Sequence, residues 1–257
     1  MDPLLFITGA SSGIGQALAR HAYDQGWRLA LVARRSDEIQ RWAEAEQLDP
    51  ARYRIYPADV AEIDSIVAAG QSCMARQGLP DVVVANAGIS VGMDTAERAD
   101  LDVLARTLAI NNVGLAATFH PFVAAMRARG SGRLVGVASV AAIRGLPGHG
   151  AYCASKAGVV SYCESLRGEL RGSGVRVVTL APGYVDTPLT RKNRYRMPFL
   201  MTPQAFAAQA WPLIGRGVSY RVIPWPMGVV AKLLRLLPDS LFDRLLAGRP
   251  RKHRAAE

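Results

Sequence analysis

Short apolar runs alternate along most of the chain with longer stretches in which apolar residues recur at helical spacing. The apolar runs are typical of buried parallel strands and lie at residues 4–7, 27–33, 53–57, 81–85, 133–138 and 175–180. The intervening stretches predict helices at 14–26, 39–48, 62–77, 100–129 and 150–172. Strands that alternate with helices through short connections predict an α/β fold, with one doubly wound parallel sheet of about seven strands and helices on both faces.

The regular alternation thins out after about residue 190. Residues 219–224 predict the seventh strand. The apolar stretches 229–237 and 241–246 predict two short helices, because Pro238 ends the first and Asp239 caps the second.

A glycine-rich turn joins the first strand to the first helix. Gly9, Gly13 and Gly15 allow a tight turn and a close approach of the backbone to a pyrophosphate, and the helix N-terminus supplies free N–H groups. The spacing is G-x-x-x-G-x-G, and the alternative interpretation is a glycine-rich helix cap. The clear strand before the turn and the clear helix after it favour dinucleotide binding.

The residues after the second and third strands bear on the choice of cofactor. An acidic residue after the second strand would bind the ribose 2′-hydroxyl of NAD, but this chain has Arg34 and Arg35 there. Two guanidinium groups suit a 2′-phosphate, so NADP(H) is predicted over NAD(H), unless the pair is merely solvated at a helix start. Asp59 could accept a hydrogen bond from an adenine amino group, cap the helix at 62–77, or do both.

Tyr152 and Lys156 are four residues apart and therefore share one face of a predicted helix. A fixed ammonium favours the phenolate and would lower the phenol pKa toward the operating pH, so the pair is a candidate general acid/base. The alternative is an ordinary exposed helix pair. Ser139 ends the fifth strand, where ligands bind in open α/β sheets. Asn111 and Asn112 lower the helix propensity of 100–129, which suggests a specific role for one of them.

In these motifs the chain resembles the short-chain dehydrogenase/reductase family over residues 3–190, which implies a Rossmann-like single domain. The resemblance implies that Tyr152 exchanges a proton with a carbonyl or alcohol oxygen, that Lys156 lowers its pKa and holds the nicotinamide ribose, and that Ser139 binds the substrate oxygen. Asn111 would hold a water that links Lys156 to solvent. The implied cofactor-binding residues are Gly9, Ser11, Ser12, Gly13, Ile14, Gly15, Arg34, Arg35, Asp59, Val60, Asn86, Ala87, Gly88, Tyr152, Lys156, Pro182, Gly183, Val185 and Thr187.

The same resemblance implies an NADP-dependent oxidoreductase that acts on a carbonyl or secondary alcohol, and a homodimer or homotetramer. We assign 1–190 to the dinucleotide-binding and catalytic core, and 191–257 to a substrate lid and C-terminal extension of the same domain. The expected flexible lid is 188–217, whose apolar and basic residues suit an apolar substrate, although a basic solvated loop is an equal alternative. His149 could lie near the substrate, but we favour a loop position; His120 is expected to be structural. The competing function is a non-catalytic NADP-binding regulatory or interaction protein on the same fold.

The chain has 31 Lys and Arg against 21 Asp and Glu, and residues 191–257 carry the entire net charge of +10. Apolar helices beside a cationic tail suggest membrane contact through 225–254 and a peripheral reductase of lipid-like substrates, although packing on protein is favoured. Nucleic-acid binding is not expected, because the tail lacks interleaved aromatic residues. Three cysteines without ligand spacing predict reduced thiols and no metal site. No signal peptide or membrane-spanning run is evident, so the expected location is cytoplasmic, with membrane association as the alternative.

Overall fold

The computed structural model describes residues 2–191, 193, 196–248, 252 and 254. Its centre is a seven-stranded sheet in the order β3-β2-β1-β4-β5-β6-β7, and each neighbouring pair is parallel. The strands are β1 (Leu4–Thr8), β2 (Arg28–Ala33), β3 (Tyr53–Pro57), β4 (Val82–Ala85), β5 (Gly132–Val137), β6 (Val175–Pro182) and β7 (Tyr220–Ile223). The predicted fold class is confirmed, including the seventh strand.

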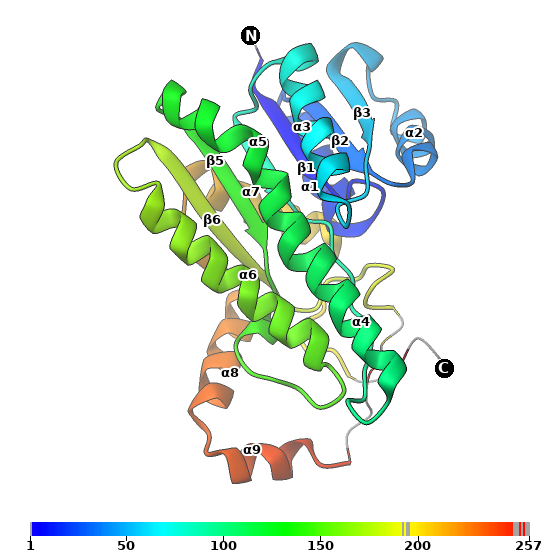
Figure 1. Ribbon diagram of the computed structural model, residues 1–257, viewed down its shortest axis with the longest axis vertical. Coiled ribbons are helices and arrows are strands. Elements are labelled where there is room, and N and C mark those ends of the chain that lie inside the picture. The colour runs from blue at the N-terminus through cyan, green and yellow to red at the C-terminus, as the bar shows by residue number, and fades with distance from the viewer. Residues whose placement is uncertain (1, 192, 194–195, 249–251, 253, 255–257) are drawn as a thin grey trace.

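Helices cover both faces of the sheet (Figure 1). They are α1 (Gly13–Asp24), α2 (Ser36–Ala45), α3 (Ile63–Gln77), α4 (Arg98–Leu108), α5 (Gly114–Arg129), α6 (Gly150–Glu169), α7 (Pro203–Arg216), α8 (Trp225–Leu236) and α9 (Asp239–Leu246). Helices α3, α5 and α6 bury one set of side chains against the sheet, and α1, α2 and α7 bury another against the opposite face. Alternate residues of β1 therefore belong to different cores, as the period of a strand requires.

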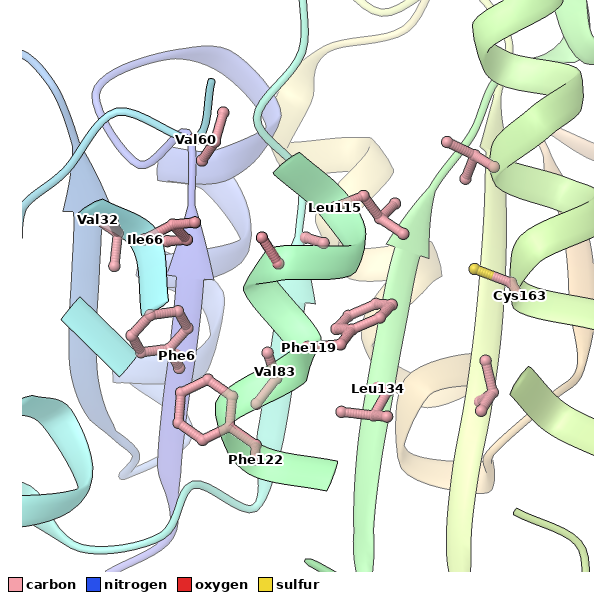
Figure 2. Close-up of a cluster of buried hydrophobic side chains, with 14 of the residues drawn as sticks. Phe6, Val32, Val60, Ile66, Val83, Leu115, Phe119, Phe122, Leu134 and Cys163 are labelled. Carbon is pink, nitrogen blue, oxygen red and sulfur yellow. The ribbon is translucent and has the colours of Figure 1, made fainter. Parts of the chain in front are cut away.

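The core beneath α3 and α5 is rich in phenylalanine (Figure 2). Phe6 of β1 and Phe122 of α5 pack with their ring centroids 4.8 Å apart, and Phe119 lies beside them over the central strands. All three side chains are fully buried. Burial of a side chain of this size stabilises the fold by roughly 1.5–3 kcal/mol, so this cluster fixes α5 on the sheet.

The helix predicted at 100–129 is interrupted, and the interruption bears on the site. A π-helical turn at Ala109–Val113 separates α4 from α5. Just after it, a Cβ on Gly114 would lie 2.5 Å from the carbonyl oxygen of Val60, so only glycine allows this approach. Together α4, the turn and α5 are long and apolar enough to cross a membrane by length and composition. The burial of Phe119 and Phe122 against the sheet identifies the stretch as a core element.

The expectation of a flexible lid over all of 188–217 is wrong for its second half. Residues 203–216 form α7, which packs on α1, and the Trp27 and Trp211 rings meet edge to face at 5.0 Å. The segment between β6 and α7 is closed at its base, where the Asp186 N–H donates a hydrogen bond to the Met201 carbonyl oxygen at 2.9 Å. The expected lid therefore excludes α7. Its basic residues Lys192 and Arg194 lie outside the described residues.

Helices α8 and α9 extend the fold beyond β7 and begin earlier than predicted, at Trp225 and Asp239. Asp239 does not cap α9 with its side chain. Its carboxylate instead accepts a hydrogen bond from Arg144 at 2.8 Å, and the Arg144 guanidinium also donates to the carbonyl oxygens of Leu234 and Leu237 and lies 3.8 Å from the Phe242 ring centroid. One largely buried arginine thus fastens both helices to the loop after β5.

Candidate functional site

A single cavity lies at the carboxyl ends of the central strands, where a parallel sheet places ligands. Of the residues predicted to act in catalysis or cofactor binding, only Gly15 and Asn111 do not line it. Those that do are Gly9, Ser11, Ser12, Gly13, Ile14, Arg34, Arg35, Asp59, Val60, Asn86, Ala87, Gly88, Ser139, Tyr152, Lys156, Pro182, Gly183, Val185 and Thr187. Ten further lining residues were not predicted and carry no chemical signal beyond their place next to motif residues: Val32, Ala33, Ala58, Ile89, Ile110, Val137, Ala138, Pro188, Leu189 and Thr190.

The glycine turn has the close contacts that a phosphate cradle requires. Gly9 and Gly13 adopt φ values of +69° and +57°, which side-chain-bearing residues rarely adopt. A Cβ on Gly15 would lie 2.1 Å from the carbonyl oxygen of Gly9, and one on Gly13 would lie 2.9 Å from Cγ2 of Thr187. A side chain at Gly15 would therefore collide with the turn itself, and a side chain at Gly13 would fill the space between the turn and the segment after β6. The cradle fits a dinucleotide.

Asn86 and Ala87 hold this turn in place through Thr8, whose role sequence reasoning missed. The buried Thr8 hydroxyl oxygen accepts hydrogen bonds from the backbone N–H groups of Asn86 at 3.1 Å and Ala87 at 3.2 Å. The Asn86 side chain donates back to the Thr8 carbonyl at 3.0 Å. These bonds tie the ends of β1 and β4 together, so Asn86 acts on the cavity mainly by fixing its backbone.

The two arginines lie at one end of the cavity with exposed side chains. Arg34 is 3.5 Å from a carboxylate oxygen of Asp59, and Arg35 donates to Glu38 at 2.8 Å and to the Ser11 hydroxyl at 3.3 Å. The interpretation of Asp59 as a helix cap is wrong, because Glu62 occupies the N-cap of α3. A 2′-phosphate placed here would meet two guanidinium groups, which fits NADP.

Tyr152, Ser139 and Lys156 converge at the floor of the cavity. Ser139 is buried at the end of β5 and hydrogen-bonds the Tyr152 side chain. The buried Lys156 ammonium donates to the carbonyl oxygen of Val137 at 2.8 Å and lies 5.8 Å from the Tyr152 ring centroid. The first two turns of α6 and the end of β5 thus bring a phenol, a hydroxyl and an ammonium to one place.

Burial controls the ionisation of this group. It raises the pKa of Tyr152 above its usual value of 10.0, and the hydrogen bond with Ser139 opposes that rise. Burial also lowers the pKa of Lys156 from 10.5 to about 8. The Tyr152 pKa is therefore raised and not lowered as expected, because loss of hydration has the largest effect on the phenol; the effect of Lys156 itself stays a prediction.

Asn111 lies behind the cavity wall in the π-helical turn and is fully engaged by protein groups. Its amide NH₂ donates to the Ile89 carbonyl at 3.0 Å and to the Ser155 hydroxyl at 2.9 Å, and its oxygen accepts from the Ile89 N–H. Ser155 in turn donates to the Tyr152 carbonyl at 2.8 Å. A Cβ on Gly88 would lie 3.1 Å from the Asn111 oxygen and 3.4 Å from Nζ of Lys156, so these groups share one small space.

His149 lies in the loop at the N-cap of α6, as expected; its side chain is buried, and burial lowers its pKa to about 4. Packing of the C-terminal extension on protein was favoured over membrane contact, and two residues of the cationic tail are indeed bound to the protein. Lys252 donates to the Asn193 side chain at 2.7 Å, and Arg254 donates to the buried Asp100 carboxylate at 2.7 Å. Arg249, Arg251 and His253 lie outside the described residues. Within the described part of the chain, no cluster of His, Cys, Asp and Glu could hold a metal ion.

Comparison with known proteins gives a consistent result. A family model described as short chain dehydrogenase matches residues 4–197. An uncharacterized oxidoreductase of Myxococcus xanthus is 37% identical over 92% of this chain and 93% of its own length, and a D-threitol dehydrogenase of Mycolicibacterium smegmatis is 37% identical over 72% and 71%. Two solved structures cover 96% of their own chains. An alcohol dehydrogenase from Thermococcus sibiricus complexed with 5-hydroxy-NADP has 25% identity over 87% of this chain and a TM-score of 0.78. A 3-ketoacyl-(acyl-carrier-protein) reductase from Brucella melitensis complexed with NADH has 26% identity over 86% and a TM-score of 0.77.

Proposed function

Because this chain belongs to the short-chain dehydrogenase family of oxidoreductases, we propose that it is an NADP-dependent enzyme that interconverts a carbonyl compound and a secondary alcohol. The observation that carries the proposal is the convergence of Tyr152, Ser139 and Lys156 at the floor of a cavity lined by the glycine turn. A protein that only senses a dinucleotide has no need of a buried proton donor beside a second hydroxyl.

Tyr152 acts as the general acid in reduction. Its raised pKa keeps the phenol protonated at neutral pH, so a proton is available for the oxygen of a bound carbonyl. Ser139 donates a second hydrogen bond to that oxygen and stabilises the charge that develops on it. Bound NADPH supplies the hydride, and the protein orients the reactants and controls charge.

Lys156 replenishes the proton and holds the ribose next to the nicotinamide. Its pKa of about 8 lets it exchange a proton near neutral pH, unlike an exposed lysine. Asn111 binds the Ile89 backbone and, through Ser155, the first turn of α6. It therefore fixes the positions of Tyr152 and Lys156 relative to the cavity wall. The π-helical turn around Asn111 interrupts regular helical hydrogen bonding, which suits a place where a water connects Lys156 to solvent.

Arg34 and Arg35 bind the 2′-phosphate of NADP, and Asp59 accepts a hydrogen bond from the adenine amino group. The position of all three at one end of the cavity supports this assignment. At the other end, Ile89, Val137 and Leu189 line the space near Tyr152 with apolar surface. We therefore expect an apolar ketone or aldehyde as substrate.

A panel of apolar ketones and aldehydes, followed by NADPH absorbance, tests this function. We expect turnover with at least one member of the panel and a higher kcat/KM with NADPH than with NADH. Tight NADPH binding measured by fluorescence, combined with no turnover of any ketone, aldehyde or alcohol in either direction, would instead identify a non-catalytic NADP-binding protein.

A further inference from the structure

Helix α8 presents apolar side chains outward, which reverses the usual pattern of a surface helix. Met227, Gly228 and Ala231 face the domain and are buried, while Trp225, Leu233 and Leu236 are 71%, 59% and 79% exposed. We define the α8–α9 face by its exposed apolar residues Trp225, Val229, Val230, Leu233, Leu236, Leu241 and Leu245. We propose that this face docks on the surface of an anionic membrane.

The arrangement of residues on α8 suits a helix that lies in the plane of a membrane interface. On a helical wheel the exposed apolar positions form a sector opposite the buried one, and exposed Lys232 stands on its flank. Such a helix buries its apolar sector among lipid chains while lysine and arginine reach the headgroups. Trp225 opens the helix, and tryptophan is favoured at the boundary between headgroup and acyl chain.

Charge distinguishes an anionic membrane from the other occupant of such a face, a second copy of the chain. On α8 and α9 the exposed cations Lys232, Arg235 and Arg244 outnumber the exposed acids Asp239 and Asp243, and Asp239 is paired with Arg144. Two copies that paired through this face by a two-fold axis would bring these cations together. An anionic lipid surface attracts basic residues that lie close to it.

The α8–α9 face lies on the same side of the molecule as the catalytic cavity. Both helices lie at the end of the molecule opposite the N-terminus, next to the loop that leads into α6 (Figure 1). Met227 of α8 packs directly against Gly183, which lines the cavity, because a Cβ on Gly183 would lie 3.0 Å from Cγ of Met227. Arg144, five residues after Ser139, binds the junction between α8 and α9. A docked enzyme would therefore hold its cavity close to the lipid surface.

Vesicle flotation with the full-length protein tests the proposal. Phosphatidylcholine vesicles that contain about one-third phosphatidylserine provide the anionic surface, and pure phosphatidylcholine is the comparison. We expect flotation with the anionic vesicles and at least ~10-fold weaker partitioning for Leu233→Ser/Leu236→Ser. Lys232→Glu/Arg235→Glu should weaken it too, as should high salt. Ile63→Ser on α3, where Ile63 is 53% exposed, is the matched control and should float like the wild type.

Thermal melting and NADPH binding should be unchanged in every variant, which separates loss of docking from loss of folding. Wild-type protein that stays unbound on both kinds of vesicle overturns the proposal. So does a Leu233→Ser/Leu236→Ser variant that floats as well as the wild type. A wild-type dimer that this variant converts to a monomer in light scattering, without vesicle binding by either protein, assigns the face to a second copy of the chain.

Discussion

The first 185 residues and the last quarter of the chain differ in how they are held together. In the first 185 residues, parallel strands bury apolar residues on both faces of the sheet. The sheet fixes the backbone that carries the catalytic groups. The carbonyl oxygen of Val137, at the end of β5, binds and positions Lys156. In the last quarter, α8 and α9 keep much of their apolar surface exposed and depend on single side chains such as Arg144 for attachment.

The chemical step and the attachment of the enzyme to a surface therefore depend on different parts of the chain. A site built on strand ends and the first turn of a helix keeps its geometry as long as the sheet is intact. An extension held by a few polar contacts can change its partner or position without changing that geometry. We therefore expect substitutions in the core to alter the chemical step. Substitutions in the last quarter should instead alter the attachment of α8 and α9, the location of the enzyme and the access of substrate to the cavity.

Among substitutions that leave Tyr152 and Lys156 in place, the largest effect in this comparison is expected from Ser139→Ala. Ser139 is buried and hydrogen-bonds Tyr152, and in the proposed mechanism it also binds the substrate oxygen. Loss of one such donor should lower kcat by about 100-fold. Steady-state kinetics with NADPH and the best ketone of the panel measure this. Ser173→Ala, at a hydroxyl in the turn before β6, is the control and should keep kcat near the wild-type value. A Ser139→Ala enzyme with normal kcat would remove Ser139 from the mechanism.

Arg144→Met should reveal the weak attachment of the last quarter. The variant keeps the aliphatic stem but loses the hydrogen bonds to Leu237 and Asp239 and leaves the part-buried Leu237 carbonyl without this partner. We expect a loss of about 2 kcal/mol in the free energy of unfolding, and faster proteolytic cleavage between α8 and the preceding strand. Arg98→Met removes an exposed ion pair with Asp102 and should change stability by less than about 0.5 kcal/mol. Equal effects of the two changes would show that Arg144 does not anchor the helices.

Arg34→Asp should change cofactor preference rather than the chemical step. It replaces a guanidinium at the cavity edge by a carboxylate beside Asp59, which repels a 2′-phosphate. We expect KM for NADPH to rise roughly tenfold or more, with little change for NADH. Arg41→Asp on the outer face of α2 is the matched control, because Arg41 is exposed and does not line the cavity. Unchanged preference in Arg34→Asp would place the phosphate elsewhere.

The smallest predicted effect is a change in the free energy of unfolding, which a substitution that removes activity should increase. Burial lowers the pKa of Lys156 to about 8, so the folded state binds fewer protons than the unfolded state between that pH and 10.5. The buried charge costs about 3 kcal/mol at neutral pH, and the bond to Val137 that would be lost offsets about 2 kcal/mol of it. Lys156→Met should therefore be inactive yet about 1 kcal/mol more stable at pH 7.

Urea unfolding at several pH values measures this difference. Wild-type stability should rise relative to that of Lys156→Met as the pH increases from about 8 to about 10.5. A variant that is less stable than the wild type at every pH would show that Lys156 is not held under strain in the fold.

The sequence predicts the core well because its information is local. A strand of alternating or continuous apolar residues, a glycine at a forbidden φ and a Tyr and Lys one turn apart can each be recognised within a few residues. The carboxyl ends of parallel strands then bring Gly9, Ser139 and Tyr152 together without further information. The same reasoning could not find Thr8 or Ser155, because their partners Asn86 and Asn111 are 78 and 44 residues away.

The wrong predictions have two physical causes. The π-helical turn and the raised Tyr152 pKa depend on packing and burial, which spacing does not reveal. The extent of the lid was overestimated because α7 carries mixed residues, and its fit against Trp27 on the far side of the sheet is a long-range contact. The contacts of Arg144 with Asp239 and of Arg254 with Asp100 also join residues that are far apart in the sequence. They could not be predicted, because the sequence around each arginine is typical of an exposed basic residue.

The central claim is that Tyr152 delivers the proton in a reaction whose cofactor is bound by other residues. Tyr152→Phe tests it most directly, since the ring and its packing remain while the hydroxyl is lost. We predict a 10²- to 10⁴-fold decrease in kcat, roughly the contribution of a general acid, with the fluorescence-measured Kd for NADPH within about twofold of the wild type. Near-normal turnover in this variant would contradict the account.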